Sequence, residues 1–125
     1  MDKVVELNGV GGCIRLFVDR NEWCRCQLVA DGVTDLGAET LTYIVSHLLE
    51  ALDRTNWQKI GYISNCPVRW VLSLAEAHCI LYAAESDSDL ILIWQGKDEH
   101  VIGNLRLSAE QCRQWRNTLS ALRSL

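Results

Sequence analysis

Apolar residues recur with the period of an α-helix in two parts of the chain, and each recurrence marks one face that must be buried. In the first part, from Ala38 to about Asp53, six apolar side chains lie three or four residues apart: Leu41, Ile44, Val45, Leu48, Leu49 and Leu52. Thr34 or Asp35 can cap this helix. The second part opens with a capping-box pattern, Ser108-Ala109-Glu110-Gln111, and then places four residues on one side as far as the C-terminus: Cys112, Trp115, Leu119 and Leu122. The sequence therefore predicts two amphipathic helices.

Outside the helices, apolar and polar residues alternate with a period of two, which is typical of strands with one buried face. Three such segments precede the first helix and four precede the second: Val4–Leu7, Ile14–Val18, Trp23–Ala30, Val68–Leu74, His78–Ala84, Leu90–Gln95 and Val101–Leu107. Ile60–Ser64 is left open as a short strand or a loop. Short connections favour antiparallel neighbours. The predicted fold class is α+β, with one domain over residues 1–125, a mostly antiparallel sheet in the order βββ-α-ββββ-α, and two helices packed on one face.

The net charge of the chain favours some classes of binding partner and disfavours others. The chain has 125 residues, with 12 Lys plus Arg against 16 Asp plus Glu and a formal net charge of -4. Nucleic-acid binding is disfavoured because a phosphate backbone requires a basic face, whereas a basic protein partner is electrostatically favoured. The N-terminal residues lack a signal-peptide pattern, and no apolar run approaches the roughly 18 residues that span a bilayer. We therefore expect a cytoplasmic protein that does not bind a membrane.

Six cysteines could indicate disulfides or a metal site, but the absence of a signal pattern favours reduced, mostly buried thiols. Cys24-Arg25-Cys26 is too closely spaced for the usual structural zinc pair, in which about two to four residues separate the ligands. No metal, cofactor or catalytic residue is predicted. A cysteine nucleophile would need a histidine beside it. The candidates for such a pair are two cysteines and three histidines: Cys66, in a predicted loop, then Cys13, with His47, His78 or His100.

Two kinds of residue are predicted to bind a protein partner. Three acids, Glu85, Asp87 and Asp89, lie in one polar connection, where they are either a solvated hairpin tip or an electronegative rim that faces a basic protein. Five tryptophans are more than the core of so small a domain ordinarily requires. Three of them share apolar faces and are predicted to lie in the core: Trp70, Trp94 and Trp115. Trp23, beside Arg25, and Trp57, at the end of the first helix, remain as interface candidates.

The pattern as a whole resembles the small, acidic α+β immunity proteins that neutralise bacterial toxins in polymorphic-toxin and contact-dependent-inhibition systems. The likeness rests on size, charge and element order, including two segments: Trp23-Cys24-Arg25-Cys26-Gln27-Leu28 before the first helix, and Leu105-Arg106-Leu107-Ser108 leading into Trp115. The resemblance implies a stoichiometric inhibitor that occludes or distorts a cognate toxin domain. It carries over no site residues, because it includes no diagnostic motif.

The predicted function is therefore a non-enzymatic protein-binding module and, in its most specific form, an immunity-type inhibitor. Its predicted partner-binding residues are Trp23, Arg25, Trp57, Glu85, Asp87 and Asp89. Two alternatives stay open. One is a small enzyme or ligand-binding domain with a cysteine and a histidine in a pocket, and the other is a homodimeric accessory subunit that pairs through an open sheet edge. The monomer and the homodimer both stay open.

Overall fold

The computed structural model describes residues 2–53, 62–63, 66–67, 70–83, 90–98 and 100–123. The first half contains four strands and a helix: β1 (Lys3–Gly9), β2 (Gly12–Val18), β3 (Trp23–Val29), β4 (Val33–Thr40) and α1 (Leu41–Leu52). Two short strands pair with each other, β5 (Tyr62–Ile63) and β6 (Cys66–Pro67). The chain then forms β7 (Trp70–Ser73), β8 (Ala77–Ala83), β9 (Leu90–Gly96), β10 (Val101–Leu107) and α2 (Ala109–Arg123).

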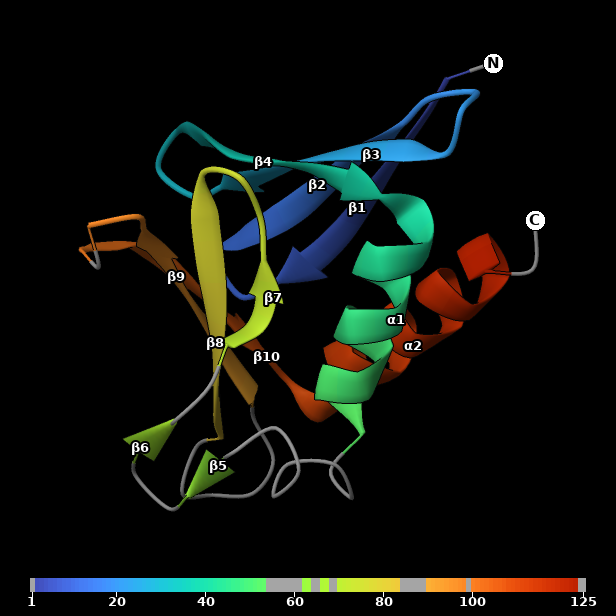
Figure 1. Cartoon of the computed structure of the whole chain (residues 1–125). Helices are drawn as coiled ribbons and strands as arrows, with labels where there is room; N and C mark the ends of the chain where they lie inside the picture. The colour runs from blue at the N-terminus through green and yellow to red at the C-terminus, as the bar shows by residue number, and fades with distance from the viewer. Residues whose placement is uncertain are drawn as a thin grey trace.

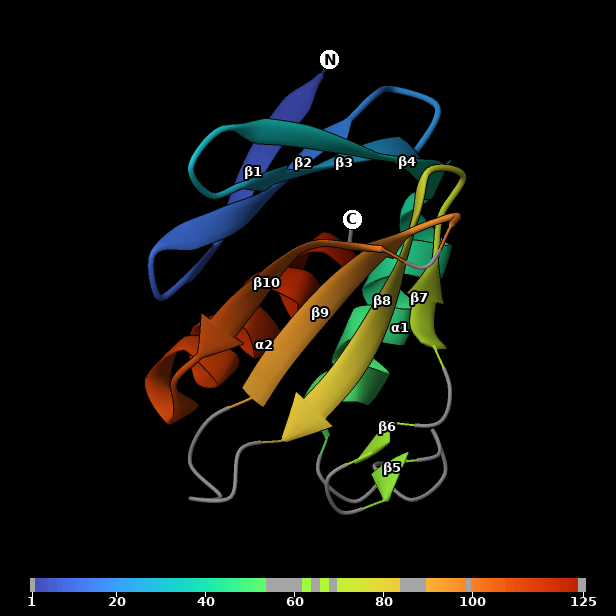
Figure 2. The ribbon, with the colours of Figure 1, turned by 90° about the vertical axis from the view of Figure 1, so that its left-hand side faces the viewer.

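The strands form two antiparallel meanders of four strands each, with the spatial orders β1-β2-β3-β4 and β10-β9-β8-β7. Both helices lie against one face of the β7–β10 sheet, and the β1–β4 sheet crosses the end of these two layers (Figures 1 and 2). The predicted α+β class is confirmed. Among the described residues, no helix is long and apolar enough to cross a membrane.

The first meander contains one strand more than predicted. Residues assigned to the start of a helix at Ala38 instead form β4, which pairs with β3, and α1 begins at Leu41. Its cap is therefore Thr40, whose hydroxyl accepts a hydrogen bond from the Tyr43 amide at 3.3 Å, and not Thr34 or Asp35. A β-bulge explains the error, because two consecutive residues of β4, Leu36 and Gly37, are both buried and interrupt the alternation that marks a strand.

The second helix begins as predicted. The Gln111 amide donates to the Ser108 hydroxyl at 3.2 Å, and the Ser108 amide donates to the Gln111 side-chain oxygen at 3.0 Å. This reciprocal pair is a capping box, and it satisfies two backbone donors at the point where β10 turns into α2.

A single cluster of buried side chains includes residues from both sheets and both helices. Trp94 and Trp115 are each 1% exposed, which confirms their prediction as core residues, whereas the side chain of Trp70 lies outside the described residues. The Trp115 indole nitrogen donates to the carbonyl oxygen of Asn8 at 2.8 Å and so joins α2 to β1.

The two sheets also meet at a close backbone contact between β4 and the β7–β8 turn. The Glu76 amide donates to the carbonyl oxygen of Leu36 at 3.3 Å. The next residue, Gly37, has φ +109°, and a Cβ placed there would lie 2.9 Å from the Ala75 nitrogen. Glycine therefore permits both the backbone conformation of the bulge and the approach of the second sheet.

Candidate functional site

The β1–β4 sheet has one face without a described element over it. Both helices and the β7–β10 sheet lie on the opposite side of this sheet in the two views of the ribbon (Figures 1 and 2). Strand β3 alternates accordingly: Cys24 and Cys26 are buried, whereas Trp23 and Arg25 are exposed. We call the side on which Trp23 and Arg25 lie the outer face.

The strand register places the outer-face residues in three rows that run across the strands. The middle row is polar and consists of Glu6, Arg15, Gln27 and Asp35. A mostly apolar row on one side consists of Val4, Phe17, Arg25 and Ala38, and Trp23 lies alongside it, two residues from Arg25 on β3. A row on the other side consists of Asn8, Cys13, Val29 and Val33. The large apolar residues at the margins are well exposed: Val4 at 57%, Trp23 at 46% and Val33 at 59%.

Two ion pairs connect the strands of the outer face. Arg15 Nη2 lies 3.3 Å from Glu6 Oε2, and Arg25 Nε lies 3.8 Å from Asp35 Oδ1. Two positive and two negative side chains cancel in formal charge. The described part of this face therefore gives no electrostatic preference for a basic over an acidic partner.

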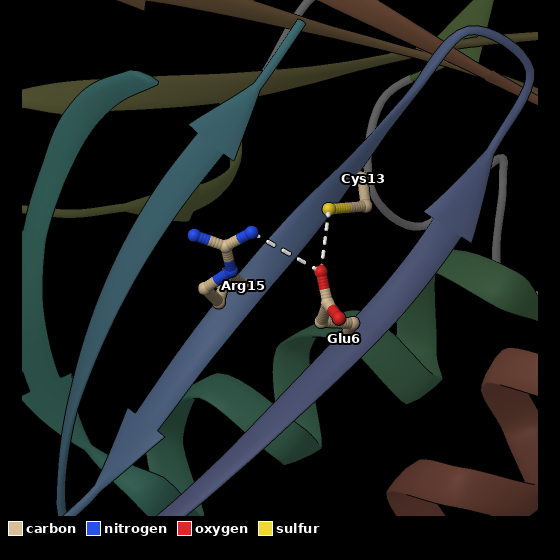
Figure 3. A network of polar contacts seen from close by, with 3 residues as sticks. All are labelled: Glu6, Cys13 and Arg15. Atoms are coloured by element: carbon tan, nitrogen blue, oxygen red, sulfur yellow. Dashed lines mark hydrogen bonds and ion pairs between the residues drawn. The ribbon is translucent and has the colours of Figure 1, made fainter. Parts of the chain in front are cut away.

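Cys13 lies beside the Glu6–Arg15 ion pair and contacts its carboxylate (Figure 3). Its thiol donates to Glu6 Oε2 at 3.5 Å, the same oxygen that accepts from Arg15. Burial, followed by the neighbouring Glu6 carboxylate, raises the pKa of the Cys13 thiol. The thiolate that a nucleophile needs is therefore disfavoured at this candidate position.

The other members of the predicted cysteine and histidine pairs are not brought together in the described residues. The side chains of Cys66 and His78 lie outside them. His47 Nδ1 is 2.8 Å from the carbonyl oxygen of Tyr43, and the His100 ring contacts the Asp98 carboxylate, whose pKa it lowers. Within the described part of the chain, no group of three or more His, Cys, Asp or Glu side chains is placed to hold a metal ion.

Two of the predicted partner-binding residues, Trp23 and Arg25, lie together on the outer face. The other four lie outside the described residues: Trp57, Glu85, Asp87 and Asp89. Sequence reasoning missed the rest of the surface. Glu6 and Arg15 could have been found by aligning the first two strands across their turn, whereas Asp35 was assigned to a helix cap because β4 was not recognised.

Two comparisons with known proteins find no relative of this chain. No family model matches the chain, and no curated protein matches it.

Proposed function

We propose that this protein is a protein-binding module that uses the outer face of the β1–β4 sheet and, in its most specific form, an immunity-type inhibitor of a bacterial toxin domain. The observation that carries the proposal is the exposure of Trp23, at 46%, against 1% for Trp94 and Trp115. Tryptophan and arginine are enriched among the residues that dominate binding energy at interfaces. Arg25 lies two residues from Trp23 on the same strand and the same face.

The arrangement of the rows supports a protein partner. Exposed apolar side chains at Val4, Trp23 and Val33 flank a row whose charges are paired with each other. A partner can therefore bury the apolar margins without leaving an isolated charge in the interface, which would be costly.

The size of the face indicates what else the partner must touch. Four strands about 4.8 Å apart and seven residues of about 3.3 Å give a footprint of about 440 Å², whereas a stable interface buries about 800 Å² per partner. The loops at the two ends of β3, residues 19–22 and 30–32, adjoin the face and are largely exposed. An inhibitor that binds tightly would include these loops in its interface.

The proposal is tested by placing a photo-crosslinking residue at Val33, on the outer face and 59% exposed, and, as a control, at Val101. Val101 is similarly exposed, at 58%, but belongs to the other sheet. The captured protein is then purified, and its affinity is measured for the wild type and for the Trp23→Ala, Arg25→Ala and Val101→Ala variants. We expect Trp23→Ala to weaken binding at least 30-fold, as hot-spot residues do, and Val101→Ala to weaken it less than about threefold. Equal binding by wild type and Trp23→Ala would overturn the proposed surface.

The immunity-type form has a separate test. The captured partner is expressed alone and together with each variant in a bacterial host. Toxicity that the wild type relieves and Trp23→Ala does not relieve is the expected result. A partner that binds through Trp23 but is harmless when expressed alone would contradict the inhibitor form and leave the binding module in place.

A further inference from the structure

The two helices form a second surface, separate from the outer face. Where α1 and α2 lie side by side, a groove of about 600 Å³ opens between them. Its lining comes from the C-terminal half of each helix and the α1 cap: Leu49, Leu52 and Asp53, and Arg116, Ser120 and Arg123. Leu52 is buried and Leu49 packs partly against the core, so the groove has an apolar floor.

The arginines of the groove differ from three other described arginines, which lie in ion pairs. On the outer face, Arg15 and Arg25 each lie in an ion pair, and on α2 itself Arg113 pairs with Glu110. Among the described residues, no carboxylate forms an ion pair with Arg116 or Arg123, although both side chains are exposed. Helix α2 contains three arginines and one glutamate in a chain whose net charge is -4. Within the described part of the chain, the α2 side of the groove therefore carries two guanidinium groups without an ion-pair partner, in an acidic protein.

Arg116 and Arg123 differ in their position on α2, and this difference shows which of the two better tests ligand binding. Arg123 is in the last turn of α2, where a basic side chain also complements the partial negative charge of the helix end. Arg116 lies in the middle of the helix and gains nothing from that end. The two residues are seven apart, which is about 10.5 Å along the helix axis. The spacing matches two carboxylates seven residues apart on a helix, or about three apart on an extended strand.

We propose that the groove between α1 and α2 binds an acidic peptide segment of a partner protein. Apolar side chains of the segment pack on the partly exposed Leu49, and its carboxylates pair with the guanidinium groups of Arg116 and Arg123, which suit bidentate carboxylate binding. This inference rests on charge complementarity in the groove and is independent of the function proposed for the outer face.

The probe is a fluorescein-labelled, alanine-rich 14-residue peptide with two glutamates seven positions apart and leucines between them on the same helical face. The control is the same peptide with both glutamates replaced by glutamine. Fluorescence polarisation gives the affinity, and amide chemical shifts of the full-length protein locate the bound peptide. We expect the glutamate peptide to shift resonances of Leu49, Leu52 and Ser120, and to bind about tenfold more tightly than the glutamine peptide.

Two arginine substitutions on α2 serve as the test variant and its matched control. Arg116→Gln should weaken the glutamate peptide about tenfold, whereas Arg113→Gln, outside the groove, should change its affinity less than about twofold. Arg123→Gln repeats the measurement if Arg116→Gln does not fold. Equal affinity for the two peptides, equal effects of Arg113→Gln and Arg116→Gln, or no binding at millimolar peptide would overturn the proposal. Displacement by inorganic phosphate at the same concentration as by unlabelled peptide would also overturn it, because the groove would then be a general anion site.

Discussion

The two four-stranded meanders share a plan and differ in the face that they turn to solvent. Each ends in a strand that runs directly into a capped helix, at Thr40 in the first and at Ser108 in the second. Their inner faces are alike, because both supply leucine and other apolar side chains to one core. On the outer side, the first meander presents cross-strand ion pairs between exposed apolar margins. The described outer residues of β9 and β10 include Ile91, Ile93 and Val101, which line a shallow apolar hollow of about 410 Å³ with Asn104.

This difference shows which residues the fold constrains and which it leaves free. Burial against a shared core imposes the same alternation of apolar residues on both sheets. The residues of the inner faces are therefore determined by the packing of the core. The outer faces are under no such constraint, and their described residues differ, with ion pairs on the first sheet and isoleucine and valine on β9 and β10 of the second. The binding function proposed for the first meander therefore rests on its outer face and not on its fold.

The largest expected effect separates the two faces of a single strand. Leu92 and Ile93 are neighbours in β9, but Leu92 is 1% exposed in the core and Ile93 lies on the outer side. Leu92→Ala should lower the free energy of unfolding by about 2–5 kcal/mol, because it leaves a cavity, whereas Ile93→Ala should lower it by less than about 1 kcal/mol. Urea denaturation followed by tryptophan fluorescence measures both. A loss at Ile93 as large as that at Leu92 would mean that the outer side of this sheet is buried, and the comparison would fail.

A smaller effect tests the contact that joins the two sheets. Gly37 and Gly32 both have positive φ, +109° and +144°, but only at Gly37 would a Cβ meet another segment, the backbone of Ala75 at 2.9 Å. Both Gly→Ala substitutions should be destabilising by about 1–2 kcal/mol because of the backbone conformation. Gly37→Ala should cost about 1–3 kcal/mol more, because the close approach overpacks the junction. Equal losses in thermal or urea unfolding would show that the sheets do not depend on this contact.

How much the sequence predicts differs between the core and the surface. The helical stripe from Leu41 to Leu52 and the capping box at Ser108 are local patterns, and both appear in the structure at the expected residues. The sequence pattern does not predict strand β4, because the bulge at Leu36 and Gly37 breaks the alternation. The predicted start of the helix, Ala38, therefore precedes the observed start of α1 at Leu41. Local pattern also does not reveal that the strands divide into two sheets, because that division depends on pairing between distant segments.

The outer face shows the same limit. Alternation along β3 is enough to place Trp23 and Arg25 on the exposed side. The ion pairs require the register of two strand pairs, β1–β2 and β3–β4. The bulge in β4 shifts the second register, so Asp35 could not be matched to Arg25 from sequence. The position of Arg116 in a groove likewise follows only from the packing of α1 against α2.

The smallest expected effect concerns the ion pairs that distinguish the first meander from the second. The side chains of Arg25 and Asp35 are 63% and 47% exposed, and their closest atoms are 3.8 Å apart. Solvent screening limits such a pair to a coupling of about 0.5 kcal/mol or less in a double-mutant cycle of Arg25→Ala and Asp35→Ala, measured by urea denaturation. A coupling well above about 1 kcal/mol would assign the pair to folding and remove one reason to regard the outer face as a binding surface. A negligible coupling, together with weaker partner binding by Arg25→Ala, would indicate that the charges of the first meander serve recognition, because they would then contribute to the complex and not to the fold.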